Sequence, residues 1–271
     1  MPGSSQSADS RTAAEQAVAV IPARYGSTRF RGKALASIAG KPMIQHVWER
    51  VRQAQSVARV VVATDDERIA AAVRAFGGEV EMTRETHRSG TERVAEVASR
   101  LEAEIYVNVQ GDEPLLDPAA IDAAVEALEE DPGTQIATLA VRIAAAEVLG
   151  NPNVVKVVTD FEDNALYFSR APIPWLRVEG RAEGPTESDV APRHLKHVGL
   201  YVFRRAALLE FPLLPPGELE RAEQLEQLRW LENGYRIRVV ETDYDSVGVD
   251  VPEDVARVEE TLRQRAAAER D

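Results

Sequence analysis

Short apolar runs alternate with amphipathic segments along the first half of the chain. The runs have the length of strands buried on both faces, and the segments between them repeat apolar side chains at helical spacing. Strands are predicted at residues 18–21, 60–63 and 105–109, and helices at 43–51, at 69–76 and from Ser89 onward. Such alternation is typical of right-handed βαβ units, so we predict an α/β fold with a doubly wound, mostly parallel sheet.

The pattern changes after residue 141, where three predicted strands follow one another before the next predicted helix. Strands are predicted at residues 154–159, 165–169, 197–203 and 237–241, with a helix at 219–233 ended by Gly234 and a last helix opened by Pro252. We interpret residues 154–217 as an inserted antiparallel section. Residues 1–16 are small and polar and predict a disordered tail, which leaves residues 17–271 as a single domain.

Composition narrows the classes of function. The chain has 271 residues, of which 44% are hydrophobic, enough for one substantial core, and it has no apolar run long enough to span a membrane. The net charge of −13 opposes binding to a nucleic-acid backbone, and the lack of cysteine excludes disulfides and thiolate metal sites. No signal peptide is visible, so we expect a cytoplasmic protein. If such an acidic chain binds a triphosphate, its cations must be gathered locally.

The stretch after the first predicted strand combines small residues with three arginines and a lysine, in the sequence PARYGSTRFRGK at 22–33. Backbone amides in such a loop can approach phosphate oxygens while the cations neutralise them. It is not a Walker A motif, because five residues separate Gly26 from Gly32 and Ala34 follows Lys33. The G-x-G-x-x-G fingerprint is absent, which disfavours a dehydrogenase. By composition alone, a basic surface loop stays open.

The same stretch resembles the PARYxSTRLPGKPL loop of the 3-deoxy-manno-octulosonate cytidylyltransferases, or CMP-Kdo synthetases, Kdo being 3-deoxy-D-manno-oct-2-ulosonate. The resemblance extends over residues 18–262. It implies that Arg24, Ser27 and Lys33 bind CTP, with Arg24 and Lys33 on the phosphates. Phe30, Arg31 and Ala34 depart from the Leu, Pro and Pro that are usual in the family. The loss of two prolines predicts a looser loop.

A second nucleotide-contacting block of the family resembles residues 83–93 and implies that Arg84 and Ser89 contact CTP, in preference to a purine nucleotide. From the residues alone, Ser89 and Glu92 form an S-x-x-E capping box at a helix start. Both roles can hold together, because a capped helix N-terminus also attracts anions.

Two aspartates stand in motifs that resemble the family's metal ligands. Asp112 lies in VNVQGDEP at 107–114, past a buried strand, and Asp250 lies in VGVDVPED at 247–254, before the last helix. By residue type alone, either is an ordinary turn or helix-cap residue. The resemblance implies that both hold Mg²⁺, that Lys33 acts with them in catalysis, and that Gln110 contacts the nucleotide. Oxygen ligands suit Mg²⁺ without a His or Cys cluster.

Three later segments resemble the side of the site that binds the acidic sugar. The resemblance implies that Arg170 in YFSRAPIPW meets the sugar acid, that His197 and Tyr201 in KHVGLY contact it, and that Glu226 and Gln227 in LEQLR bind its hydroxyls. By residue type alone, the histidine is a core or edge residue and the last two are ordinary exposed helix positions.

The resemblance implies a homodimer, with the inserted section in dimerisation, and the reaction of CTP with Kdo to give CMP-Kdo and pyrophosphate for lipopolysaccharide biosynthesis. The anomeric hydroxyl would attack the α-phosphorus in line, with the protein positioning groups and neutralising charge. Two alternatives stay open: a cytidylyltransferase for another acidic sugar, such as sialic acid or amino-Kdo, and a non-catalytic nucleotide sensor. Retention of both aspartates disfavours the sensor, because nucleotide binding alone does not need a metal pair.

Overall fold

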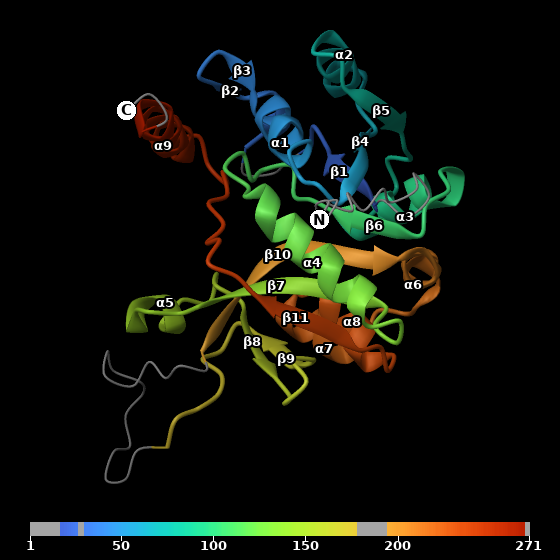
Figure 1. Ribbon diagram of the computed structural model, residues 1–271, viewed down its shortest axis with the longest axis vertical. Helices are drawn as coiled ribbons and strands as arrows, with labels where there is room; N and C mark the ends of the chain where they lie inside the picture. Colours follow the sequence, from blue (N-terminus) through green and yellow to red (C-terminus); the bar gives the residue numbers. More distant parts are fainter. Residues whose placement is uncertain (1–16, 27–29, 178–193, 269–271) are drawn as a thin grey trace, which may run out of the picture.

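The computed structural model describes residues 17–26, 30–177 and 194–268 (Figure 1). The expected tail at residues 1–16 and Ser27 lie outside this range. The main sheet runs through β1 (Ala17–Ala23), β4 (Val57–Thr64), β5 (Glu79–Met82), β6 (Ile105–Asn108), β7 (Ile136–Arg142), β10 (Leu195–Arg204) and β11 (Ile237–Glu241). The expectation of an α/β fold with a mostly parallel sheet is confirmed.

The strand order is β11-β7-β10-β6-β1-β4-β5. Strands β5, β4, β1 and β6 are mutually parallel, and so are β7 and β11, whereas β10 is antiparallel to both β6 and β7. Off this path, β8 (Lys156–Thr159) pairs antiparallel with β10 and with β9 (Ala165–Ser169). Part of the segment expected to be inserted therefore runs through the middle of the main sheet.

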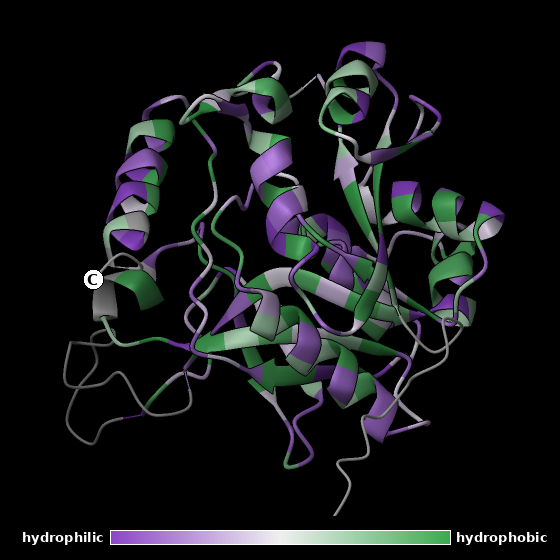
Figure 2. Cartoon of the chain, turned by 45° about the horizontal axis from the view of Figure 1, so that its top comes forward, coloured by the Kyte–Doolittle hydropathy of each residue, from purple (hydrophilic) through white to green (hydrophobic). Residues whose placement is uncertain are grey.

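Helices cover both faces of the sheet. One face packs against α1 (Met43–Val51), α2 (Glu67–Ala75) and α4 (Pro118–Glu130), and the other against α3 (Gly90–Arg100), α6 (Arg205–Glu210) and α8 (Gln227–Glu232). Along β1, Ala17, Ala19 and Ile21 enter the first core and Val18 and Val20 the second, as the period of two in a strand requires. Figure 2 shows apolar strands inside and polar colouring on the outward sides of the helices.

Smaller elements complete the chain. They are the 3₁₀ helices η1 (Lys33–Leu35) and η3 (Phe211–Leu213), the strand pair β2 (Ser37–Ile38) and β3 (Lys41–Pro42), and the helices α5 (Ala146–Gly150), α7 (Glu218–Glu223) and α9 (Glu253–Ala268). The last helix was expected to be opened by Pro252, and α9 begins one residue later, at Glu253. Among the residues described, no helix is both long and apolar enough to cross a bilayer.

The single helix predicted at residues 219–233 is wrong, because α7 and α8 are separate. Gln224 adopts the left-handed conformation (φ 53°), which an α-helix cannot contain. The break turns Leu225 into the core and lets Thr91 donate to the Glu226 carboxylate. The end of the helix is as predicted, with Gly234 at a φ of 82°.

Candidate active site

A pocket of about 330 Å³ opens at the carboxyl edge of β1 and β6, where ligands bind in open α/β sheets. Its walls come from the end of β1, from η1, from the N-terminus of α3, from the loop after β6 and from the segment before α9. The lining residues are Pro22, Ala23, Arg24, Lys33, Ala34, Met43, His87, Arg88, Ser89, Gly90, Arg93, Gln110, Gly111, Asp112 and Asp250. Six of the candidate site residues named from the sequence thus meet in one place: Arg24, Lys33, Ser89, Gln110, Asp112 and Asp250.

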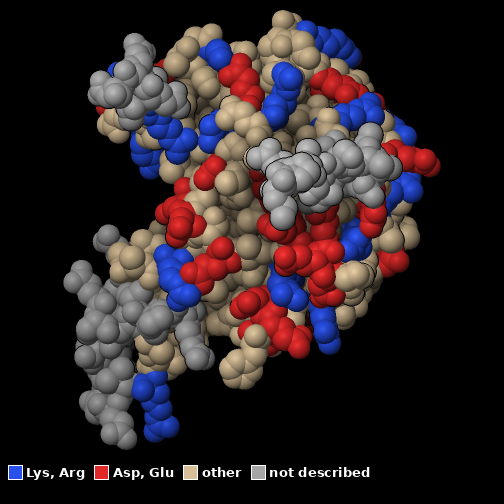
Figure 3. All heavy atoms as spheres, in the orientation of Figure 1, with Lys and Arg blue, Asp and Glu red and all other residues tan. Residues whose placement is uncertain are grey.

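Cations are concentrated in this pocket although the chain as a whole carries a charge of −13. Arg24, Lys33 and Arg88 line it, together with Arg93, whose buried guanidinium lies 2.9 Å from the Asp65 carboxylate. On the face shown in Figure 3, by contrast, acidic and basic side chains are interspersed. The local gathering of cations that an acidic, triphosphate-binding chain needs is present.

Lys33 lies between the two aspartates. Its Nζ is 2.5 Å from Asp112 Oδ2 and 3.4 Å from Asp250 Oδ1, and only 16% of its side chain is exposed. Gly32 takes a φ of 72°, and a Cβ there would lie 3.0 Å from the Tyr25 ring, so a glycine is needed for the turn that presents Lys33. Residues 217 apart in sequence are thereby brought into contact.

The backbone around the two aspartates is held in place. The Val249 amide donates to the Asp112 carbonyl at 2.9 Å, which ties the segment before α9 to the loop after β6. The Asp254 side chain accepts from the amides of Asp250 and Val251, at 2.8 and 3.1 Å. Gly111 sits against β1, where a Cβ would lie 3.0 Å from the Pro22 carbonyl oxygen.

The two carboxylates fit a magnesium ion. Both already face one cationic group, the Lys33 ammonium, and their oxygens are hard ligands. Within the described residues, no group of three or more His, Cys, Asp or Glu side chains forms a metal cage. Mg²⁺ is usually held by one or two carboxylates together with substrate phosphates, so a pair of aspartates beside phosphate-binding cations is a suitable donor set.

The loop departures Phe30, Arg31 and Ala34 have identifiable contacts. Phe30 packs against the small core formed by Ile38, Met43, Leu115, Val249 and Val258. Ala34 is buried within η1, and the Arg31 guanidinium lies 5.7 Å from the centre of the Tyr25 ring. The apolar contact of Phe30 therefore anchors the described part of the loop from the side of α9.

The N-terminus of α3 forms another wall, and Ser89 caps it. The Ser89 Oγ accepts from the Glu92 amide at 3.2 Å, while the Glu92 carboxylate accepts from Arg88 N at 2.8 Å, one residue earlier than in a standard capping box. Arg84 is not among the pocket-lining residues. Its side chain is 71% exposed, and it borders a neighbouring hollow instead.

A buried polar cluster adjoins this wall. The Thr91 Oγ1 donates to Glu226 Oε1 at 2.6 Å, and Asn108 Nδ2 lies 3.4 Å from the same hydroxyl. Tyr201 stands opposite Asn108 across β10 and β6. Within the described residues, Asn108 Oδ1, Tyr201 OH and Glu226 Oε2 are shielded from solvent without a hydrogen-bond partner. Unsatisfied buried polar atoms are costly, so this cluster is a candidate for contact with a polar ligand, although none of its residues lines the pocket itself.

The remaining sugar-side predictions are placed differently, and their roles stay predictions. Arg170 Nε donates to the Glu223 carbonyl at 2.8 Å and its Nη1 to the Pro152 carbonyl at 3.0 Å, away from the pocket lining. The His197 ring packs edge-on against Phe168, with Nε2 3.0 Å from Thr138 Oγ1, and burial lowers its pKa to about 3. Gln227 is buried at the start of α8.

Gln110 joins the pocket to the strand that carries Tyr201. Its Nε2 donates to the Gly199 carbonyl at 2.9 Å, beside the irregular register of β10 against β7. The side chain thus bridges the loop after β6 and β10, and it lines the pocket as well.

Sequence reasoning missed Thr91, Arg93 and Asn108 as site residues. Asn108 carries a usable signal, because it is a polar residue within an otherwise apolar strand and is fully buried. The signal for Arg93 is weaker. It is a charged residue on the side of a helix that faces the core, and such a charge needs a partner, which here is Asp65. The neighbouring Asp66 caps α2, where its side chain accepts from the Arg68 amide at 2.9 Å.

Comparisons with known proteins agree with this geometry. The model of the family described as cytidylyltransferase matches residues 18–237. The chain belongs to the cytidylyltransferase family. The 3-deoxy-manno-octulosonate cytidylyltransferases of Geobacter sulfurreducens and Geotalea uraniireducens are 60% and 58% identical over 247 and 249 residues. These alignments cover 90% and 91% of this chain and 98% of each relative.

Among solved structures, a CMP:2-keto-3-deoxy-manno-octonic acid synthetase in complex with CTP is 47% identical to this cytidylyltransferase. It superimposes with a TM-score of 0.84 over 92% of this chain and 99% of that one. A 4-diphosphocytidyl-2C-methyl-D-erythritol synthase from Anaerococcus prevotii has a TM-score of 0.60 at 12% identity over 92% of this chain and 99% of that one, and shares the fold alone.

Proposed function

We propose that this cytidylyltransferase transfers CMP from CTP to the anomeric hydroxyl of Kdo, releasing pyrophosphate and giving CMP-Kdo for lipopolysaccharide biosynthesis. The observation that carries the proposal is the meeting of Lys33, Asp112 and Asp250 in a cation-lined pocket beside a buried, unsatisfied polar cluster. The cation-lined pocket suits a nucleoside triphosphate, and the polar cluster suits a polyhydroxylated acceptor. The relatives named for this reaction support the choice of substrates.

CTP would lie along the pocket wall formed by η1 and α3. Arg24 and Lys33 would neutralise the triphosphate, and the α3 N-terminus with Ser89 would add backbone amides and the positive end of the helix dipole. The leaving pyrophosphate would gain charge during the reaction, so cations already in place stabilise that transition state.

Asp112 and Asp250 would hold the magnesium ion. When bound, the metal would neutralise phosphate charge and lower the pKa of the attacking hydroxyl. Lys33 would then exchange its two carboxylate partners for phosphate oxygens, because it is the cation next to both aspartates.

Kdo would occupy the cluster around Thr91. Its hydroxyls would supply the partners that Asn108 Oδ1, Tyr201 OH and Glu226 Oε2 lack among the described residues. Tyr201 would serve as a neutral hydrogen-bonding group, because burial and the nearby Glu226 charge raise its pKa well above the ordinary value. The acceptor hydroxyl would face the α-phosphorus in line, with the leaving group on the opposite side.

The product assay tests the proposal against its alternatives. The protein is incubated with CTP, Mg²⁺ and either Kdo, amino-Kdo or sialic acid, and products are identified by mass spectrometry. We expect CMP-Kdo as the fastest product, with ATP and GTP far poorer than CTP. Faster turnover of another acidic sugar would reassign the acceptor. CTP binding without any product would indicate a nucleotide sensor.

We also propose a cytoplasmic homodimer. CTP as a substrate supports the compartment, and the family resemblance supports the dimer. Between residues 154 and 217, the side chains of Phe161, Leu166, Trp175 and Leu213 are largely exposed, which suits an interface. Light scattering at micromolar concentration should give the dimer mass, and Phe161→Ser with Leu166→Ser should weaken association. A monomer in the unaltered protein would contradict the proposal.

A further inference from the structure

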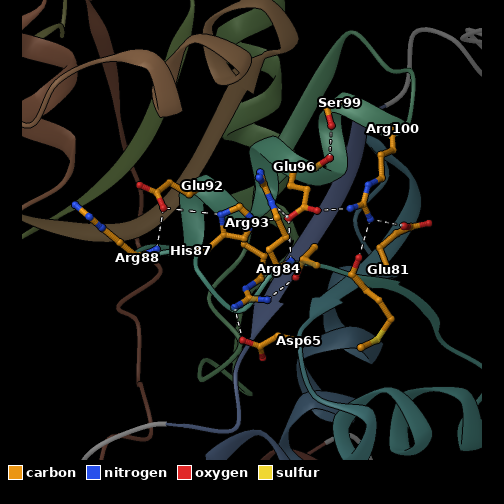
Figure 4. A network of polar contacts seen from close by, with 12 residues as sticks. Asp65, Glu81, Arg84, His87, Arg88, Glu92, Arg93, Glu96, Ser99 and Arg100 are labelled. Atoms are coloured by element: carbon orange, nitrogen blue, oxygen red, sulfur yellow. Dashed lines mark hydrogen bonds and ion pairs between the residues drawn. The ribbon is translucent and has the colours of Figure 1, made fainter.

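Two glutamates of α3 hold the segment that leads into the helix, residues 83–88 (Figure 4). Glu92, on the first turn, accepts from the Arg88 amide at 2.8 Å. Glu96, one turn further on, accepts from the Arg84 amide at 3.0 Å and from His87 Nε2. The segment is thus fastened at both ends to the helix whose N-terminus lines the pocket.

Glu96 is the centre of this arrangement. Only 6% of its side chain is exposed, and its second oxygen accepts from the Arg100 guanidinium. Burial by itself raises the pKa of Glu96, but bonds from the Arg84 amide and His87 and the charge of Arg100 outweigh burial and lower the pKa to about 2. A buried carboxylate with this many donors is ionised and fixed in position.

His87 is the residue through which Glu96 reaches the pocket. Its ring is 8% exposed and lies between two carboxylates, with Nε2 bonded to Glu96 and Nδ1 3.8 Å from Glu92 Oε2. The ionised Glu96 carboxylate only accepts, so Nε2 carries a proton and the ring orientation is fixed. The same histidine lines the pocket together with Arg88 and Ser89.

We propose that Glu96 is a positioning residue for the nucleotide: by holding His87 and the Arg84 backbone, it preforms the α3 wall of the pocket. CTP then meets an ordered wall rather than a segment that must be ordered on binding, which improves affinity without a contact to the reacting atoms. Glu96 is absent from the pocket lining and acts only through the residues it holds. This role rests on the proposed use of CTP.

The test uses Glu96→Gln, which keeps the size of the side chain but removes its charge. Calorimetry should show CTP binding weakened by about tenfold, with kcat changed less than twofold. The matched control is Glu81→Gln, because Glu81 also faces Arg100, at 3.6 Å, but does not hold the segment. Its CTP affinity should match that of the unaltered protein. An equal loss in both variants would overturn the proposal.

A double-variant measurement separates positioning from general loss of stability. If Glu96 acts through His87, then Glu96→Gln combined with His87→Ala should bind CTP no more than about twofold worse than His87→Ala alone. If the losses of CTP affinity in the two single variants instead multiply in the double variant, the proposal is overturned. Thermal denaturation identifies unfolded variants, in which case Glu96→Asp takes the place of Glu96→Gln, with the same expectation. An unaltered protein that binds CTP but gives no product would instead refute the proposed function.

Discussion

Replacing Asp112 or Asp250 with asparagine separates metal binding from a structural role. Each change keeps the size of the side chain and removes the negative charge. Asparagine caps a helix about as well as aspartate, so a capping residue would tolerate the change. The structure also shows another group serving the start of α9, because the Asp254 carboxylate accepts from the amides of Asp250 and Val251.

The expected magnitudes differ between stability and turnover. The Lys33–Asp112 pair is partly exposed, at 16% and 31% of the two side chains, so its loss should lower the free energy of unfolding by about 1 kcal/mol or less. Lys33 would still face the other aspartate. If both carboxylates hold the metal, turnover should fall by two to three orders of magnitude, or roughly 3–4 kcal/mol of transition-state stabilisation.

The assay follows pyrophosphate release at saturating CTP and Kdo while Mg²⁺ is titrated. Thermal denaturation of the same samples confirms that the variants are folded. We expect both variants to melt within a few degrees of the unaltered protein while losing almost all turnover. Most of the activity remaining in both at saturating Mg²⁺ would refute the metal site and return Asp112 and Asp250 to structural roles.

Two further predictions concern the polar cluster and its neighbour. Glu226→Gln keeps an acceptor for Thr91 but removes the charge. Because an unsatisfied buried group costs about 1–3 kcal/mol, the KM for Kdo should rise about tenfold or more, while calorimetry shows unchanged CTP affinity. Weakened CTP binding with normal use of Kdo would contradict this prediction. His197 has a folded-state pKa of about 3 against 6.5 when unfolded, so the folded protein binds fewer protons between these values and loses stability as pH falls from 6.5. His197→Gln should therefore shrink the drop in urea-unfolding free energy between pH 7 and pH 4.5 by about 1–3 kcal/mol, and an unchanged drop would show that His197 is solvated.

The fold was largely accessible from sequence because its strands and helices follow local periodicity. Residues 43–51 appear as α1 and residues 165–169 as β9, both with the predicted bounds. The place of β10 could not be predicted, because nothing local determines that a strand pairs with β6 on one side and β7 on the other. Which distant strands pair depends on how the whole chain packs, including the helices that cover the two faces of the sheet.

The split between α7 and α8 shows where helical periodicity fails. Residues 219–233 consist mostly of good helix formers. The Glu226 carboxylate nevertheless accepts a hydrogen bond from Thr91, and Arg229 pairs with Glu220 across the break at 2.6 Å. These tertiary contacts outweigh local propensity. The Asn108 and Thr91 contacts are likewise visible only once β6 and α3 are packed together.

Motif comparison located the pocket residues better than residue chemistry did. Arg24, Lys33, Gln110, Asp112 and Asp250 line one pocket, although an aspartate before a helix is by itself an ordinary cap. Arg84 and Arg170 were also chosen by motif, but neither lines this pocket, and their roles toward a ligand stay predictions. Arg84 Nε lies 3.5 Å from the Glu96 carboxylate, and Arg170 Nε donates to the Glu223 carbonyl. The position of a residue within a motif does not by itself distinguish side chains that line the pocket from those that lie away from it.

Because Lys33 contacts Asp250, the site depends on a segment of chain that follows the last strand of the sheet. Within the described part of the chain, the last strand of the sheet ends at Glu241, so all of these strands precede residue 250. The bond from Val249 to the Asp112 carbonyl then brings the second carboxylate to the pocket. A chain whose described strands are all paired can thus still lack half of its proposed metal ligands, until the segment before α9 docks against the loop after β6.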